Sequence, residues 1–233
     1  MLRIKRIVMK YEDLVNVVDE FEQEIDLTEC IYFGAIKKLE NVQTDIGKLD
    51  DVQHIKRVIK PFLVQWGMMG RVVGREGLEW EKLGRMLRGL EQEFKQLRGK
   101  KLLTINFDEG FVSSSIRTIY RELDNIPYIG SPTAISKILH LLNPEIFVMW
   151  DNDIRKMYKK KNKHIRDTSE GYLEFLKETQ KELKEAFEER QKQTGKNFHE
   201  IEQEIRRRYK NKTLARIIDE YNWSKAHPNF VKN

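Results

Sequence analysis

The sequence has 233 residues, with 43 lysines and arginines against 37 aspartates and glutamates, and its formal net charge is +6 at pH 7. A chain of this length can bury a core without disulfides, and its single cysteine, Cys30, excludes an internal disulfide and a cluster held by four cysteines. No apolar run approaches the roughly 20 residues of a membrane span, so we expect a cytoplasmic protein.

Apolar residues recur at helical spacing along most of the chain. The resulting stripes predict helices over residues 14–25, 83–97, 116–123, 135–142 and 176–187. Four glycines in residues 67–77 predict a loop or a broken helix, and Gly99 and Gly195 are placed to end the helices before them. Residues 102–107 are expected to form an extended connection rather than a sheet.

The predicted elements define an all-α fold, a helical bundle that contains a helix-hairpin-helix unit over residues 114–158. Residues 1–233 are expected to form a single helical body. In an alternative organisation, the N- and C-terminal helices form a second lobe.

The predicted hairpin has the sequence Asn-Ile-Pro-Tyr-Ile-Gly-Ser-Pro-Thr-Ala and covers residues 125–134. Gly130 permits a close turn, Ser131 can cap the following helix, and Pro132 suits its first position. Backbone N–H groups at such a helix start bind a phosphate without regard to base sequence. An ordinary capped corner between two helices is the alternative. The DNA contacts expected from the hairpin are Tyr128, Ile129, Gly130, Ser131 and Thr133.

A basic run follows the hairpin unit, because residues 155–166 hold seven lysines and arginines and no acid. This concentration is typical of a polyanion-binding surface, although a solvated charged loop is an alternative. The expected DNA contacts are Arg155, Lys156, Lys159 and Lys160. A second basic run, 206–212, either extends this surface or is a solvated helix face.

Between the hairpin helix and the basic run lie a short apolar segment and the sequence Asp151-Asn152-Asp153-Ile154-Arg155. The whole arrangement, from Asp124 to Lys156, resembles the core of the helix-hairpin-helix DNA glycosylase superfamily, and most closely its adenine-excising branch. The resemblance implies DNA repair by cleavage of the N-glycosidic bond of a damaged or modified base. It assigns to Asp151 the stabilisation of the cationic sugar. Tyr128 replaces the family's first hairpin glycine.

The resemblance also bears on the mechanism. Bifunctional members carry a lysine just after the second hairpin glycine, where this chain has Ser131 and Pro132, so water is favoured over a Schiff base. Lys137, one helical turn further on, is the alternative lysine for a lyase route. The iron–sulfur cluster of some relatives cannot form with one cysteine, and we expect no cofactor and no metal. The expected partner is DNA, and a non-catalytic, sequence-independent DNA-binding protein is the alternative function.

Chemistry supports the same residue independently, because a fixed carboxylate stabilises the positive charge that grows on a sugar as its base departs. A plain helix N-cap is the alternative role for Asp151, and the two roles are compatible. His140 is expected to be a satisfied, partly buried histidine. An aromatic and thioether-rich segment before the glycines can wall a base pocket or pack in the core. The base-pocket candidates are Trp66, Met69, Arg71 and Trp150.

Overall fold

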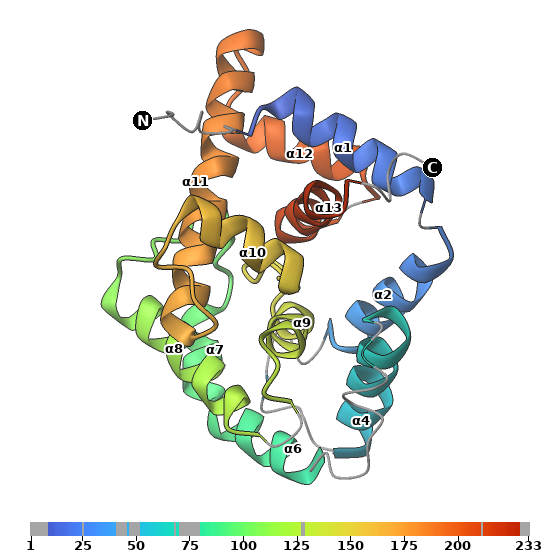
Figure 1. The fold of residues 1–233 in the computed structure, drawn as a ribbon, viewed down its shortest axis with the longest axis vertical. Helices are drawn as coiled ribbons and strands as arrows, with labels where there is room; N and C mark the ends of the chain where they lie inside the picture. Colours follow the sequence, from blue (N-terminus) through green and yellow to red (C-terminus); the bar gives the residue numbers. More distant parts are fainter. Residues whose placement is uncertain are drawn as a thin grey trace.

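The structure is a computed structural model that describes residues 9–24, 26–40, 46, 52–67, 69, 80–126, 129–210 and 212–228. These residues contain eleven α-helices and one π-helical turn, and no strand occurs among them, which confirms the all-α fold class (Figure 1). The elements are α1 (Tyr11–Glu24), α2 (Asp26–Lys38), α4 (Val52–Pro61), η2 (Phe62–Trp66), α6 (Trp80–Gly89), α7 (Glu91–Leu97), α8 (Gly110–Asp124), α9 (Pro132–Leu142), α10 (Asn152–Lys161), α11 (Ser169–Thr194), α12 (Phe198–Arg208) and α13 (Leu214–Ala226).

The prediction of one helix over residues 83–97 is wrong, because the chain breaks between α6 and α7. Leu90 leaves the helical conformation, with φ −99° and ψ 16°. Its side chain nevertheless stays buried, and its N–H is shared between the carbonyls of Met86 and Leu87. The apolar spacing therefore continues through the break, so periodicity alone does not reveal it.

The predicted helix ends are confirmed where a special backbone conformation is required. Gly195 has φ 72° and its N–H bonds to the carbonyl of Gln191, which ends α11. Gly99 follows α7 with φ 71°. Residues 102–107 form no strand, as predicted, but residues 102–104 and 107 lie in turns rather than in an extended connection.

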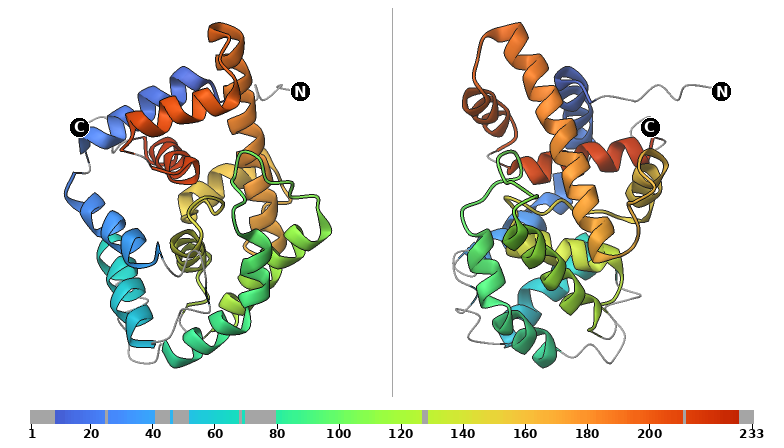
Figure 2. Two further views of the ribbon diagram at one scale, coloured as in Figure 1. Left: turned by 180° about the vertical axis from the view of Figure 1, so that it is seen from behind. Right: turned by 90° about the vertical axis from the view of Figure 1, so that its left-hand side faces the viewer.

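The described helices pack around one continuous cluster of buried apolar side chains. The long helix α11 packs on α8 at one end of the molecule and on α1 and α12 toward the other, and α1 also packs on α13 (Figure 2). In Figure 1, α9 and α13 are both seen nearly end-on in the middle, with α10 between them. α10 packs on α13, α8 packs on α9, and η2 packs on α2 and α4. None of the described helices is both long and apolar enough to cross a membrane.

Candidate functional site at the junction of α9, α10 and α13

Asp151 precedes α10 and uses its two carboxylate oxygens differently. Oδ1 accepts hydrogen bonds from the backbone N–H groups of Asp153 and Ile154, both at 2.9 Å, so the side chain caps the helix. Oδ2 takes no part in this cap and lies 3.8 Å from Nε2 of His227. The side chain of Asp151 is 24% exposed, so it is held in place without being sealed in the core.

His227 follows α13 and faces two carboxylates. Its Nε2 lies 3.4 Å from Oδ2 of Asp153 as well as 3.8 Å from Oδ2 of Asp151. Nδ1 lies 2.8 Å from the carbonyl oxygen of Trp223, and because a carbonyl only accepts, Nδ1 donates this bond. A proton on Nε2 therefore requires the charged imidazolium, which would pair with both carboxylates.

Lys137 reaches the same region from α9. Its ammonium donates to the carbonyl oxygen of Gly67 at 3.1 Å and lies 5.3 Å from the centroid of the Trp66 ring. Burial lowers the pKa of Lys137 below its ordinary value, while the negative charges of Asp219 and Asp151 oppose this shift. Lys137 and Asp151 therefore lie close enough to interact electrostatically.

Helix α13 contributes buried charges to this junction. Asp219 is 6% exposed and accepts a hydrogen bond from the guanidinium of Arg216, which lies over the Trp66 ring at 4.9 Å from its centroid. Burial raises the pKa of Asp219 to about 6, while Arg216 and Lys137 act to lower it. Two titratable groups with pKa values shifted toward neutrality thus stand beside Asp151, a combination found often at functional sites.

The same network of buried charges continues around Arg216, which also contacts Glu29 at 2.5 Å and Glu220 at 3.0 Å. The carboxylates of Glu22, Glu29 and Glu220 have oxygen atoms within 4.8 Å of one another, a grouping suited to a cation. The fully buried Lys212 ammonium contacts all three and lies 3.0 Å from Glu29. Burial disfavours the charged ammonium, but Glu220 and Glu29 outweigh this and raise the pKa of Lys212. Lys212 and Arg216 together therefore supply the positive charge that joins α13 to α1 and α2.

The three base-pocket candidates that the structure describes do not line one open pocket. Trp66 is partly buried and stacks on Phe62 with ring centroids 4.7 Å apart, in contact with the Lys137 region. Met69 is buried, and Trp150 has no exposed surface and donates its indole N–H to a backbone carbonyl. Met69 and Trp150 are therefore core residues rather than walls of an open pocket. Arg71 lies outside the described residues.

The turn before α9 is accessible at Gly130, which is exposed. Ser131 occupies the N-cap position of α9 as predicted, but its hydroxyl makes no capping bond, so the first amides of α9 have no side-chain acceptor. Ile129 is buried and its N–H donates to the carbonyl of Ile126, so this residue supports the turn from inside. Tyr128 lies outside the described residues.

Arg155 differs from the expected surface contact because it is only 7% exposed. One guanidinium nitrogen donates to the Thr133 hydroxyl at 2.9 Å and to the carbonyl of Trp150 at 3.3 Å, which ties α10 to the first turn of α9. Its Nε lies 3.1 Å from the carboxylate of Asp167, which also pairs with Lys159 at 2.9 Å.

The rest of the first basic run is mostly exposed. Lys156 is exposed and pairs with Asp153 at 2.8 Å on the same helix. Lys160, Lys163 and Arg166 are also exposed. These cations form the accessible part of the run, on the side of α10 and of the loop that leads to α11.

In the second basic run, three cations pair with acids of other elements, whereas Arg207 and Lys210 are exposed. Arg206 pairs with Glu145 at 3.1 Å, Arg208 pairs with Asp19 at 2.5 Å, and Lys212 is buried in its carboxylate cluster. These three cations connect α12 and the chain after it to other elements, and we therefore do not assign them to a nucleic-acid surface.

His140 is confirmed as a satisfied buried histidine. Its Nδ1 lies 2.6 Å from the carbonyl oxygen of Phe147 and donates to it, so Nε2 accepts from the Tyr32 hydroxyl at 2.9 Å. Burial lowers the pKa of His140 to about 3, so the ring is neutral at physiological pH.

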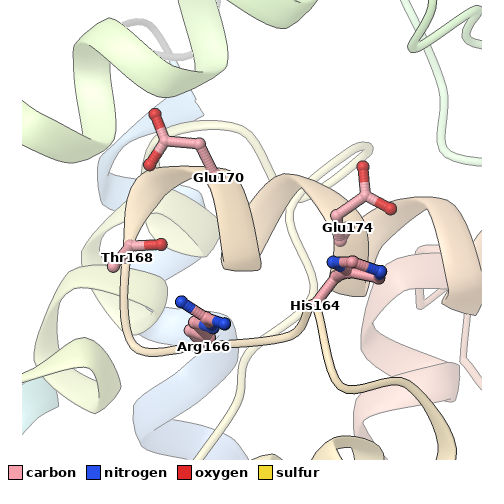
Figure 3. Close-up of a pocket in the computed structure, with 5 residues that line it drawn as sticks. All are labelled: His164, Arg166, Thr168, Glu170 and Glu174. Carbon is pink, nitrogen blue, oxygen red and sulfur yellow. The ribbon is translucent and has the colours of Figure 1, made fainter.

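A surface depression of about 690 Å³ lies in the loop between α10 and α11 and against the first turns of α11 (Figure 3). Neither Asp151 nor Lys137 lines it, so it is separate from the junction described above. Its lining residues are His164, Arg166, Thr168, Glu170 and Glu174.

Sequence reasoning did not find the contributions of α13 and His227. Arg216 and Asp219 stand three residues apart, on one face of a helix, but this spacing is equally common for ion pairs on exposed faces. Their burial depends on which other helices cover α13, and one sequence does not contain that information. Nothing around His227 marks it, since its partners are far from it in the chain.

Comparisons of the chain with protein-family models, curated proteins and solved structures find no match.

Proposed function

We propose that the protein is a DNA N-glycosylase-like enzyme that releases a damaged or modified base. The observation that carries the proposal is the geometry of Asp151: one oxygen is fixed by two backbone N–H groups while the other stays outside the cap, in a partly exposed side chain. A carboxylate held this way needs little reorganisation to face a developing positive charge.

In the proposed reaction, the bond between the sugar C1′ and the base nitrogen breaks and its electron pair leaves with the base. Oδ2 of Asp151 faces the positive charge left on the sugar. Water then adds to C1′ and gives up a proton, and a carboxylate or the neutral amine of Lys137 can accept it. Burial favours the neutral amine, because it lowers the pKa of Lys137.

The same amine supports a second route. A neutral lysine can attack C1′ as the base leaves with the electron pair of its bond. The new amine loses a proton, and the C1′–O4′ bond then opens, with O4′ taking up a proton, to give a Schiff base that leads to strand cleavage. Lys137 interacts electrostatically with Asp151. It also donates a hydrogen bond to the carbonyl of Gly67, and this hydrogen bond must break before the amine attacks. The monofunctional route with water therefore remains the first proposal.

DNA would be held on the exposed side of the same elements. The turn at Gly130 is accessible, and the first amides of α9 have no side-chain cap. Lys156, Lys159 and Lys160 add positive charge nearby on α10. Contacts of this kind bind the phosphate backbone without reading sequence.

The second candidate is a protein that holds DNA without a reaction. The accessible turn and exposed lysines favour it, and it makes no use of Asp151. It predicts salt-sensitive DNA binding with no product on any substrate.

A substrate panel separates these functions. The protein is incubated with duplexes that carry uracil, hypoxanthine, 8-oxoguanine, alkylated or mismatched bases, and the products are examined before and after alkali. Strand breaks that need alkali indicate monofunctional excision. Breaks without alkali that disappear in Lys137→Ala, but persist in the surface control Lys192→Ala on α11, indicate the Schiff-base route. Binding without breaks on every duplex supports the second candidate and overturns the enzymatic proposal.

A further inference from the structure

Asp167 and Arg155 form an ion pair without a well-aligned hydrogen bond, next to the first turn of α9. Nε of Arg155 lies 3.1 Å from Oδ1 of Asp167, yet this buried N–H has no aligned hydrogen-bond partner. A buried donor left without an acceptor is costly, and a charged one more so. Asp167 therefore neutralises the charge of Arg155, but it does not accept a hydrogen bond from the Nε–H group.

The cationic groups around this ion pair are placed so that they could bind an anion. The Arg155 guanidinium is held from the inner side by the Thr133 hydroxyl, in the uncapped first turn of α9. The ammonium of Lys159 approaches the same Asp167 oxygen from α10, at 2.9 Å. Two cations thus converge on one carboxylate oxygen, and one of them is fixed to the first turn of α9.

Asp167 itself is held on a short, anchored loop. Ile165 and Ser169 on either side are buried, and the backbone of Arg166 lies directly against Gly171. The Asp167 side chain is nevertheless 46% exposed. An incoming anion needs only to displace this side chain, without moving the loop.

We propose that Arg155 and Lys159 form a phosphate-binding subsite that the Asp167 carboxylate occupies in the free protein. Asp167 then acts as a built-in competitor of the phosphate, and it limits how tightly the surface holds a nucleic acid. This inference rests on the proposed DNA-binding surface, but the subsite itself can be tested without DNA.

The chain supplies a matched pair of variants for the test. Asp167→Asn removes the proposed competitor, and Asp153→Asn removes a carboxylate with a similar exposure, 47% against 46%. Both changes raise the net charge by one, so the control measures the general effect of charge. Binding of a labelled duplex is measured at several salt concentrations.

We expect Asp167→Asn to bind the duplex about tenfold more tightly and Asp153→Asn to change binding by no more than about threefold. The slope of log K against log salt should become steeper by roughly one to two in Asp167→Asn alone, because Arg155 and Lys159 then pair with phosphates. Equal effects of the two substitutions would overturn the proposal.

Inorganic phosphate separates this subsite from the proposed function. The N–H resonance of the Arg155 Nε, assigned by its loss in Arg155→Lys, is followed during a phosphate titration. In Asp167→Asn it should respond at phosphate concentrations about tenfold lower than in Asp153→Asn. If phosphate binds but no duplex does, the subsite stands and the nucleic-acid function falls. If the resonance is unaffected by phosphate, the subsite is wrong.

A second pair of variants applies if Asp167→Asn fails to fold. Lys159→Gln and Lys156→Gln each remove one exposed lysine of α10, and only Lys159 belongs to the subsite. Phosphate should bind at least threefold more weakly to Lys159→Gln than to Lys156→Gln. Equal binding would contradict the proposal.

Discussion

His140 shows how a single buried side chain sets a pH dependence. It is fully buried, donates to the carbonyl of Phe147 and accepts from the Tyr32 hydroxyl. Its neutral form is part of the folded state, because burial lowers its pKa from 6.5 to about 3. The stability that depends on neutral His140 is therefore complete above pH 6.5 and is lost as the pH falls toward 3.

Replacing His140 should remove that dependence. The free energy of unfolding of the natural chain should fall, through this one group, by roughly 1.4 kcal/mol for each pH unit below about 6. His140→Gln keeps a donor and an acceptor but does not titrate, so its unfolding free energy should fall less steeply between pH 6 and 4. Urea unfolding at several pH values measures the slopes. His199→Gln, an exposed histidine variant, should keep the natural slope. Parallel slopes for all three proteins would refute this role.

At the scale of elements, the start of α11 depends on close contact between two backbone segments. A Cβ at position 171 would lie 2.0 Å from the carbonyl oxygen of Arg166, and backbone would have to move to make room. Thr168 caps the same turn through the N–H of Gly171. Only glycine fits this helix start without a shift.

Gly171→Ala should therefore destabilise the protein by about 3 kcal/mol or more. Gly34→Ala is the control, because Gly34 lies inside α2 with no atom within 4 Å of an added Cβ. That substitution should stabilise the fold by about 0.5–1 kcal/mol, since alanine favours the helix. Thermal and urea unfolding give both values. A neutral Gly171→Ala would mean that the two segments are further apart than described.

Helix α13 is also fixed by charge. Lys212, just before α13, is fully buried among three glutamates from α1, α2 and α13, whereas Lys225 within α13 pairs with Asp13 and is 36% exposed. Lys212→Met removes one of the two cations, Lys212 and Arg216, that neutralise these buried carboxylates, and it should cost about 3–5 kcal/mol of unfolding free energy. Lys225→Met should cost less than about 1 kcal/mol. Similar losses in urea unfolding would show that the buried cluster does not join the helices as described.

At the scale of the whole molecule, most of the helices follow from apolar spacing and from the residues that end them. Gly195 ends α11 because glycine accepts its positive φ, and α9 begins at Pro132, directly after the hairpin, as its residue types predict. The apolar spacing does not predict the break at Leu90, because Leu90 itself and most of the apolar residues of α6 and α7 on either side of it stay buried. Local patterns thus predict elements well, but they do not detect a change of direction that preserves the buried face.

The site could be predicted only in part. Asp151 was found because the residues around it form a local motif, and its N-cap role is confirmed. Trp150 carries the same local signal yet is core, because Tyr172 and Phe175 of α11 cover it. Asp219 lies far along the chain from Lys137 and meets it only through packing. A long-range arrangement of this kind has no signature in the spacing of residues.

The molecule as proposed depends on the free oxygen of Asp151, and a matched pair of variants tests it most directly. Asp151→Asn keeps a good N-cap and removes the charge, while Asp153→Asn removes a neighbouring charge of the same helix turn. With the best duplex of the panel in single-turnover assays, base release should fall at least about 100-fold in Asp151→Asn, with unchanged melting, and less than about threefold in Asp153→Asn. Release at the natural rate by Asp151→Asn would contradict the account.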